Sequence, residues 1–135
     1  MIKLANLLDT KNTAGICIFH ECKVLLIRKA EEGHWEIPKG HIREGEDTFD
    51  GAVRETYEET QIIVNTTKWL DEVHKGKNKE NGDFTIFRYD VDEPVVPILS
   101  EEHNAWRYFC LKTESLPEPM YKEVEKYLKK VKRTL

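Results

Sequence analysis

The segment "GHIREGEDTFDGAVRETYEETQI", from Gly40 to Ile62, decides the fold, because it reads as a loop that leads into an amphipathic helix. Glycines interrupt its first part, and Asp47 is the predicted N-cap, with Asp50 three residues later in the position of a capping-box partner. The helix is expected to end at about Thr60. Its apolar stripe is expected to pack on a sheet and consists of Phe49, Ala52, Val53, Thr56 and Thr60.

The opposite, more open side of the predicted helix carries three glutamates. Glu55, Glu58 and Glu59 stand at i, i+3 and i+4, so their carboxylates cluster on one arc of the surface. Arg54 is within one turn of Glu58, whereas the other two glutamates have mainly each other, a pairing that costs a few tenths of a kcal/mol in an isolated helix. A divalent cation would offset this repulsion, because Mg²⁺ and Mn²⁺ take carboxylate oxygens and keep waters that a phosphate can displace. A solvated acidic face is the alternative.

The rest of the chain predicts strands and a second helix. Two apolar runs, 13–19 and 23–28, flank a polar turn at His20 and Glu21 and form a predicted hairpin. The stretch "EEGHWEIPKGHIREGE", residues 31–46, is predicted to be a loop. The other predicted elements are strands over 68–74, 84–91 and 105–111, a tight turn at Asn81-Gly82, and an amphipathic helix over 120–135. We therefore expect one α/β domain over residues 1–135, an α/β/α sandwich around a central mixed β-sheet.

The composition excludes several classes of protein. No apolar run approaches the ~20 residues that span a bilayer, and "MIKLANLLDT" lacks the apolar region and cleavage site of a signal peptide. We therefore expect a cytoplasmic protein with no membrane partner. The cysteines are odd in number and show no metal-site spacing, so Cys17, Cys22 and Cys110 are predicted to be reduced, buried thiols.

The charge of the chain is unevenly distributed. The net charge is −4, yet residues 122–135 carry six Lys and Arg against two Glu. The acidic remainder opposes indiscriminate binding of nucleic acid. We interpret the basic segment as the solvated face of the C-terminal helix, and a platform for polyphosphate or RNA is the alternative.

The spacing of the central segment matches a known motif. Gly40, Glu46, Arg54 and the three glutamates form the pattern G-x5-E-x7-R-E-x-x-E-E. This pattern resembles the Nudix box, G-x5-E-x7-R-E-U-x-E-E-x-G-U, where U is a bulky apolar residue. Thr56 stands for the first U, and Gln61 replaces the closing glycine. Because glycine there serves a left-handed helix end, we expect Gln61 either to cost ~1 kcal/mol of stability or to give a differently shaped turn, without loss of the chemistry.

The resemblance to the Nudix family implies an activity and a cofactor. Members hydrolyse a nucleoside diphosphate linked to another moiety, with water attacking phosphorus while Mg²⁺ or Mn²⁺ binds the phosphates. Metal ions held by carboxylates supply the positioning and charge neutralisation that such a reaction requires. The implied ligands are Glu55, Glu58 and Glu59, with the carbonyl of Gly40 as a further donor. One of these glutamates is alternatively the base, and Arg54 is predicted to orient Glu58. Glu46 is predicted to support the helix start, with contact to an outer metal as the alternative.

Two more segments narrow the resemblance. "HWEIPKGHIREGE" and "PILSEEHNAWRYFCL" are similar to the W-x-x-P-K-G-H-x-x-x-G-E and L-S-x-E-H-x-x-aromatic-R/K-aromatic runs of the asymmetrical diadenosine tetraphosphate hydrolases, a group within the Nudix family. The resemblance covers residues 13–112. It implies that Glu102 serves a metal or the attacking water, and that Lys39 and His41 bind the polyphosphate. We interpret His103 and Trp106 as packing residues.

An adenine base needs an aromatic partner. Phe87 and Tyr89 point to one face of their predicted strand and Phe84 to the other, and we assign the base to the face of Phe87 and Tyr89. In the loop before this strand, Lys75, Lys77 and Lys79 either close over a phosphate chain or are solvated.

Three functions compete. The leading hypothesis is Mg²⁺-dependent cleavage of the small molecule diadenosine tetraphosphate (Ap4A) to AMP and ATP. The alternative enzyme removes pyrophosphate or a cap from an RNA 5′ end, which presents the same phosphate group to the same metals. A Nudix-fold module that binds nucleotides without catalysis comes third, because every glutamate of the box is present.

Overall fold

The computed structural model describes residues 8–67 and 70–135 and contains a mixed sheet with two helices. The elements follow one another along the chain as β1 Asp9–His20, β2 Lys23–Lys29, β3 Trp35–Glu36, β4 Lys39–Arg43, α1 Thr48–Thr60, β5 Asp71–Lys77, β6 Asp83–Asp90, β7 His103–Cys110 and α2 Lys122–Arg133. Neither of these helices is long and apolar enough to cross a membrane.

Strand β1 organises the sheet because it is 12 residues long and has neighbours along both edges. It runs parallel to β6 on one edge, and on the other it pairs antiparallel with β4 in its first half and with β2 at its end. β7 adds to β2, and β5 adds to β6. The sheet is therefore mixed, as the sequence predicts.

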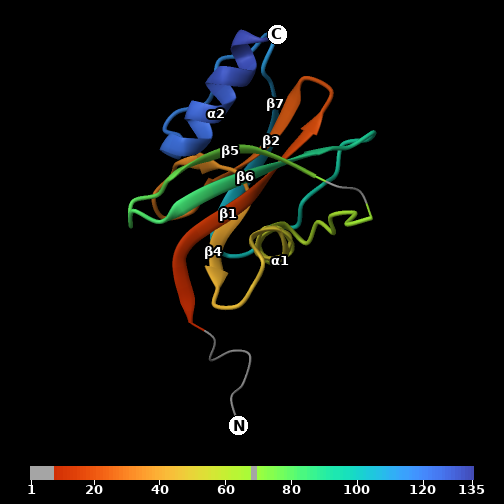
Figure 1. Cartoon of the computed structure of the whole chain (residues 1–135). Coiled ribbons are helices and arrows are strands. Elements are labelled where there is room, and N and C mark those ends of the chain that lie inside the picture. Colours follow the sequence, from red (N-terminus) through yellow and green to blue (C-terminus); the bar gives the residue numbers. More distant parts are fainter. Residues whose placement is uncertain (1–7, 68–69) are drawn as a thin grey trace.

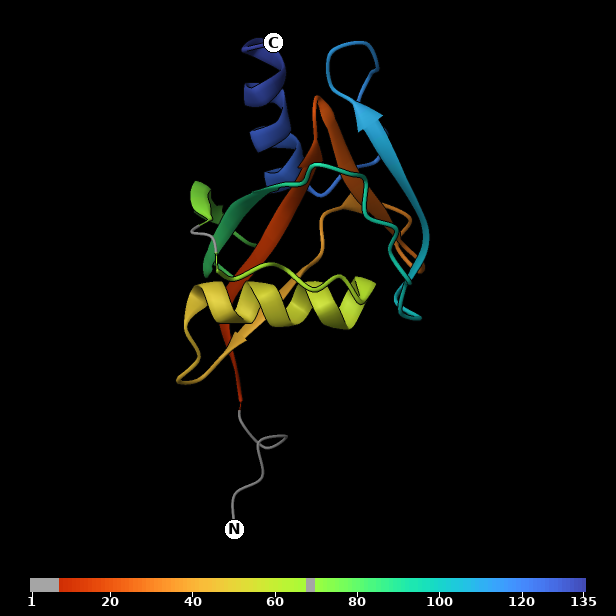
Figure 2. The ribbon, with the colours of Figure 1, turned by 90° about the vertical axis from the view of Figure 1, so that its right-hand side faces the viewer.

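Each face of the sheet carries its own helix, as Figures 1 and 2 show. Along β1, Ile16 and Ile18 belong to the cluster that includes Ala52 of α1, whereas Cys17 and Phe19 belong to the cluster that includes residues of α2. Successive side chains of a strand point to opposite faces, so one continuous apolar strand supplies both cores. The predicted α/β/α arrangement is confirmed.

Helix α1 begins and ends where the sequence predicts. The side chain of Asp47 accepts hydrogen bonds from the backbone N–H groups of Phe49 and Asp50, at 3.0 and 3.4 Å. Asp50 thus contributes its N–H to this cap. At the other end, Gln61 adopts a left-handed conformation with φ 58° and donates its N–H to Tyr57. The chain makes the turn that glycine favours, but with a residue that has a Cβ.

The predicted loop over residues 31–46 is wrong in part, because it contains β3 and β4. The backbone there runs very close to β1: a Cβ on Gly15 would lie 2.5 Å from the carbonyl oxygen of Pro38. This close approach lets β4 pair with β1, although glycine is disfavoured in strands and stands at position 40 of β4. The hairpin of β1 and β2 is confirmed, with Glu21 and Cys22 in the turn, while the predicted strand over 68–74 starts outside the described residues and is seen as β5 from Asp71.

Candidate functional site

A cleft of about 640 Å³ opens beside α1, where β4 and the segment before β7 approach the helix. We call it the acidic cleft. Seven residues predicted from the sequence line it together: Lys39, Gly40, His41, Glu55, Glu58, Glu59 and Glu102. Ser100 also lines the cleft, and its buried hydroxyl has no hydrogen-bond partner within the part of the chain that the structure describes.

The packing of β4 on α1 sets the position of the glutamates. A Cβ on Gly40 would lie 2.1 Å from the carboxyl carbon of Glu55, so a larger residue at position 40 would displace this carboxylate. The backbone N–H of Lys39 donates to Oε1 of Glu59 at 3.0 Å. The prediction that all three glutamates stand on an open face is therefore wrong: Glu59 is 5% exposed and the Glu55 side chain 15%, whereas that of Glu58 is 47% exposed.

Burial disfavours the charged forms of two of these carboxylates. Burial raises the pKa of Glu59 to about 9, because the N–H of Lys39 compensates only in part and the charge of Glu36 adds to the effect. Burial also raises the pKa of Glu55, against the opposing hydrogen bond from Arg54. A divalent cation would restore the charged forms, because carboxylate oxygens are ligands that Mg²⁺ and Mn²⁺ accept. The residues of the acidic cleft thus fit such an ion.

Arg54 lies behind the cleft and connects its glutamates. Its guanidinium donates to both carboxylate oxygens of Glu46, to Glu55 and to Glu58, all at 2.8–3.0 Å. It also donates to the backbone carbonyl of His41. The predicted pair with Glu58 is confirmed, whereas Glu46 accepts from the N–H of Arg43 at the end of β4, at 3.0 Å, and its support of the helix start stays a prediction. Five hydrogen bonds fix the guanidinium, and those it donates to Glu46 are the main cause that raises the pKa of Arg54.

Glu36 forms a buried network that the sequence analysis missed. This side chain, 1% exposed, accepts from Nε2 of His103 at 2.7 Å and from Nε2 of His34 at 2.9 Å, and Nζ of Lys39 lies 3.4 Å away. Burial alone would raise the pKa of Glu36, but the hydrogen bond from His103 and the charge of Lys39 outweigh it and lower the pKa to about 2. The available signal was a glutamate between Trp35 and Ile37, inside an apolar run.

The same network places three ligand-type side chains together. Oxygens of Glu36 and Glu59 and a nitrogen of His103 lie within 4.8 Å of one another. Both oxygens of Glu36 are already engaged, however, one by each histidine. The acidic cleft, where the Glu58 side chain is 47% exposed and that of Glu55 15%, is therefore a second candidate metal site, and Glu36 approaches it through Lys39.

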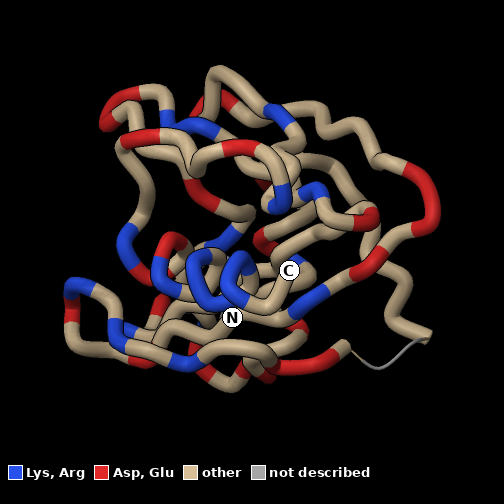
Figure 3. Tube along the Cα trace, turned by 90° about the horizontal axis from the view of Figure 1, so that it is seen from above, with Lys and Arg blue, Asp and Glu red and all other residues tan. Residues whose placement is uncertain are grey.

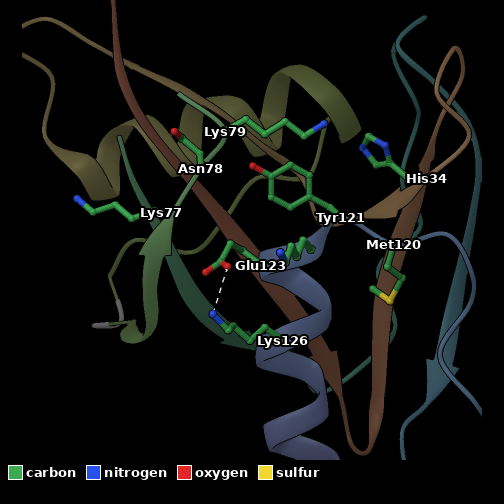
Figure 4. A pocket seen from close by; sticks show the side chains of 9 residues that line it. His34, Lys77, Asn78, Lys79, Met120, Tyr121, Glu123 and Lys126 are labelled. Carbon is green, nitrogen blue, oxygen red and sulfur yellow. Dashed lines mark ion pairs between the residues drawn. The ribbon is translucent and has the colours of Figure 1, made fainter. Parts of the chain in front are cut away.

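A second pocket of about 420 Å³ lies between the β5–β6 hairpin and the start of α2. Figure 4 shows Tyr121 between Lys77 on one side and His34 on the other, with the side chain of Lys79 reaching above the ring toward His34. We call it the Tyr121 pocket. Figure 3, seen from above, shows Lys and Arg positions along the helix that leads to the C-terminus. Lys122 and Lys126 of α2 line the pocket.

The acidic cleft and the Tyr121 pocket are connected. A smaller cavity of about 170 Å³ is lined by Lys39 and His41 of the cleft and by His34, Lys79 and Tyr121 of the pocket. The ammonium of Lys39 lies 4.1 Å from the centre of the Tyr121 ring. Glu32, Glu36 and Glu80 also line this cavity, so a path of mixed charge, with Tyr121 beside it, leads away from the acidic cleft.

The structure does not bring Phe87 and Tyr89 to this path, and Phe87 lines a separate cavity of about 250 Å³ beside Phe49, so the binding of a base by these two residues stays a prediction. Both belong to the core cluster on the α1 face, where the Phe87 ring packs edge-on against Phe49 at 5.2 Å. The hydroxyl of Tyr89 accepts from the N–H of Asn65. Because β6 has neighbours along both edges and a helix over each face, its aromatic side chains fill core space on either side. Phe84 packs in the opposite core.

The other predicted packing residues and loop lysines fall in different places. His103 is buried as expected, although its Nε2 binds Glu36, while Trp106 remains 38% exposed beside Tyr108. Lys77 pairs with Asp83 at 2.9 Å within the β5–β6 hairpin. Lys79 is the loop lysine that reaches both the pocket and the connecting cavity.

Comparisons with known proteins agree with this geometry. The family model described as "NUDIX domain" matches residues 9–131. The asymmetrical bis(5′-nucleosyl)-tetraphosphatase of Caenorhabditis elegans is 29% identical over 96% of this chain and 94% of its own length. An RNA pyrophosphohydrolase of Bartonella quintana is 41% identical over 45% of this chain and 40% of its own length. The crystal structure of a C. elegans Ap4A hydrolase binary complex superposes with a TM-score of 0.67 at 23% identity, covering 90% of this chain and 93% of that one.

Proposed function

The chain belongs to the Nudix family and is a hydrolase of phosphoanhydride bonds, and from this premise we propose that it cleaves Ap4A asymmetrically to AMP and ATP with Mg²⁺ or Mn²⁺ as cofactor. The observation that carries this proposal is the connected path from the acidic cleft to the Tyr121 pocket. A substrate with a long phosphate chain and a second nucleoside would occupy both ends of that path. The name of the C. elegans relative supports the same substrate.

The residues of the acidic cleft would hold the metal. We assign the carboxylates of Glu55, Glu58, Glu59 and Glu102 as ligands, with the carbonyl oxygen of Gly40 as a further donor. When bound, Mg²⁺ or Mn²⁺ neutralises phosphate charge. Arg54 keeps Glu55 and Glu58 in place through its hydrogen bonds, and the cleft has room for water next to them.

The remaining residues bind the polyphosphate and activate water. Lys39 and His41 line both the cleft and the connecting cavity, where their donors can reach phosphate oxygens. Nε2 of His41 lies 2.6 Å from Glu80, an exposed partner that a phosphate would displace. A carboxylate of Glu58, Glu59 or Glu102 takes the proton from the attacking water, while the phosphoanhydride oxygen leaves with the ATP half.

A nucleoside at the far end of the substrate fits the Tyr121 pocket. Tyr121 and His34 offer rings 5.9 Å apart, and Lys79 offers a charge beside them. An aromatic ring is the usual partner of a purine. We therefore assign base binding to Tyr121 in place of Phe87 and Tyr89.

A product analysis tests the proposal. Ap4A incubated with the protein and Mg²⁺ should yield equal amounts of AMP and ATP, and chelator should abolish the reaction. Glu58→Gln and Glu59→Gln should lose at least a hundredfold in kcat, on the scale expected when a base or metal ligand is removed, with circular dichroism unchanged. Glu72→Gln, on the exposed side of β5, is the matched control and should retain activity. Two molecules of ADP as product, or no turnover by the intact protein, would refute the assignment.

A second candidate substrate is the 5′ end of RNA. Lys122 and Lys126 of α2 line the Tyr121 pocket, so a longer nucleic acid leaving the pocket would meet the basic helix. The B. quintana relative carries the name of this activity. Rates on 5′-triphosphorylated RNA and on Ap4A should be compared for the intact protein and for Lys129→Glu with Lys130→Glu. Lys132 should be left unchanged, because its ammonium holds the carbonyls of Leu111 and Glu114 and its loss would disturb the fold.

A further inference from the structure

Cys22 and Cys110 lie in contact although 88 positions separate them in the sequence. Their sulfur atoms are 3.0 Å apart, and both side chains are half-buried. Cys110 ends β7 opposite Lys23 of β2, and the N–H of Leu111 donates to the carbonyl of Cys22 at 2.9 Å. Cys22 stands in the β1–β2 turn, where side chains do not have to alternate between the two faces of the sheet as they do in a strand. Its side chain can therefore face Cys110.

The two thiols of this pair differ in acidity. A hydrogen bond from Cys22, with others from Thr113 and the backbone of Lys112, lowers the pKa of Cys110 to about 7. The same contact raises the pKa of Cys22. These contacts favour Cys110 as the nucleophile, and the sulfur of Cys22, 3.0 Å away, is placed to resolve the product.

The third cysteine provides an internal control. Cys17 is fully buried in the α2-side core, and burial raises the pKa of its thiol. A buried thiol in apolar surroundings is inert toward oxidants. A reagent that reacts only with exposed thiolates should thus modify Cys22 and Cys110 in the folded protein and leave Cys17 unmodified.

We propose that Cys22 and Cys110 form an oxidation site at which a hydroperoxide produces a reversible intramolecular disulfide. The Cys110 thiolate attacks the hydroperoxide, the O–O bond breaks, and the sulfur becomes a sulfenic acid as water or an alcohol leaves. The Cys22 sulfur, after losing its proton to solvent, attacks the Cys110 sulfur, and the hydroxyl departs as water. Two thiols lose two electrons together, and one hydroperoxide gains them.

The disulfide would fasten the β1–β2 turn to the end of β7. A cross-link between residues 88 positions apart restricts the unfolded chain strongly, so the oxidised protein should unfold at a Tm higher by about 10 °C. The acidic cleft should be unaffected. His103 and Cys110 stand at opposite ends of the eight-residue strand β7, which at ~3.4 Å per residue separates them by over 20 Å.

Thiol counting tests the proposal. The reduced full-length protein is treated with hydrogen peroxide, then denatured and alkylated. The number of alkylated cysteines should fall from three to one, the remaining label should map to Cys17, and the unlabelled mass should be lower by two hydrogen atoms. Dithiothreitol should restore all three thiols and remove the rise in Tm. Three alkylated cysteines after peroxide, or a covalent dimer on a non-reducing gel, would overturn the proposal.

Single variants separate the two roles. In Cys22→Ser the peroxide reaction should stop at a sulfenic acid on Cys110, which dimedone traps, with no cross-link. In Cys17→Ser the cross-link should form as in the unchanged protein. An intramolecular cross-link that persists in Cys22→Ser, or one that disappears in Cys17→Ser, would contradict the assignment.

Discussion

At the scale of the residue, Glu36 shows how a buried charge can support a site that it does not line. Its carboxylate binds His103, the residue next to Glu102, and approaches the ammonium of Lys39. Two segments that supply residues to the acidic cleft are thereby tied together beneath it. A buried charge of this kind is tolerated because each oxygen is engaged, and removing the charge leaves its partners unpaired.

We predict that Glu36→Gln destabilises the protein by about 2 kcal/mol, the scale of losing hydrogen bonds to a buried charged group. Because the pKa of Glu36 is lowered to about 2, its charge stabilises the fold above the ordinary value of 4.5, and this contribution is lost as pH falls through 2. Urea unfolding at pH 7 and at lower pH should show the two proteins converging in acid. Glu32→Gln is the control, since Glu32 also lies beside His34, at 3.5 Å, but is exposed. Equal stability of Glu36→Gln and the unchanged protein at pH 7 would refute the role.

For Glu59 we predict that the contribution to folding stability depends on pH with the opposite sign. Its pKa is raised from 4.5 to about 9, so the metal-free folded state keeps a proton that the unfolded state releases. This contribution is fully present below pH 4.5 and is lost as pH rises through 9. With a chelator present, the Tm of the unchanged protein should therefore fall as pH rises from 4.5 through 9, and the Tm of Glu59→Gln should fall less. Added Mg²⁺ should flatten the profile of the unchanged protein, whereas a flat profile in chelator would contradict the prediction.

At the scale of the element, α1 was predictable because its signals are local. The Asp47 cap, the apolar period and the left-handed end at Gln61 all lie within the helix or next to it. β4 was missed because its pairing depends on β1, far away in the sequence, and on the close contact of Gly15 with Pro38. The burial of Glu59 was not predicted for the same reason, because helical periodicity does not reveal that β4 covers that edge of the helix.

The C-cap of α1 supplies a test of stability that is separate from the chemistry. Gln61 has φ 58°, where a Cβ is strained and glycine is not. Gln61→Gly should stabilise the protein by up to ~1 kcal/mol and raise Tm by a few degrees, with Ap4A cleavage unchanged. Asn81→Gly, at φ 63° in the β5–β6 turn, is the matched control and should gain less, because asparagine tolerates this conformation. A lower Tm for Gln61→Gly would show that the side chain itself stabilises the turn.

At the scale of the whole molecule, the acidic cleft could be predicted and the Tyr121 pocket could not. The cleft draws on two motifs whose spacing is visible in the sequence, around Gly40 and around Glu102. The pocket is assembled from the segment before β3, the β5–β6 loop and the start of α2, none of which carries a motif. Tyr121 reaches it because its backbone N–H donates to the carbonyl of Trp35, which fixes the chain before α2 against β3. Such long-range contacts leave no periodic signal in the sequence.

The connected path predicts that binding and chemistry can be separated by mutation. Tyr121→Leu removes the ring at the centre of the pocket but leaves the carboxylates of the acidic cleft untouched. Loss of one base–aromatic contact is worth ~1–3 kcal/mol, so KM for Ap4A should rise about tenfold while kcat stays within about twofold. Tyr89→Leu makes the same change in the α1-side core and should lower Tm without raising KM. Steady-state kinetics on both variants decide which tyrosine binds the base. A higher KM for Tyr89→Leu with an unchanged KM for Tyr121→Leu would show that the base binds on the face of β6 and that the Tyr121 pocket takes no part in the reaction.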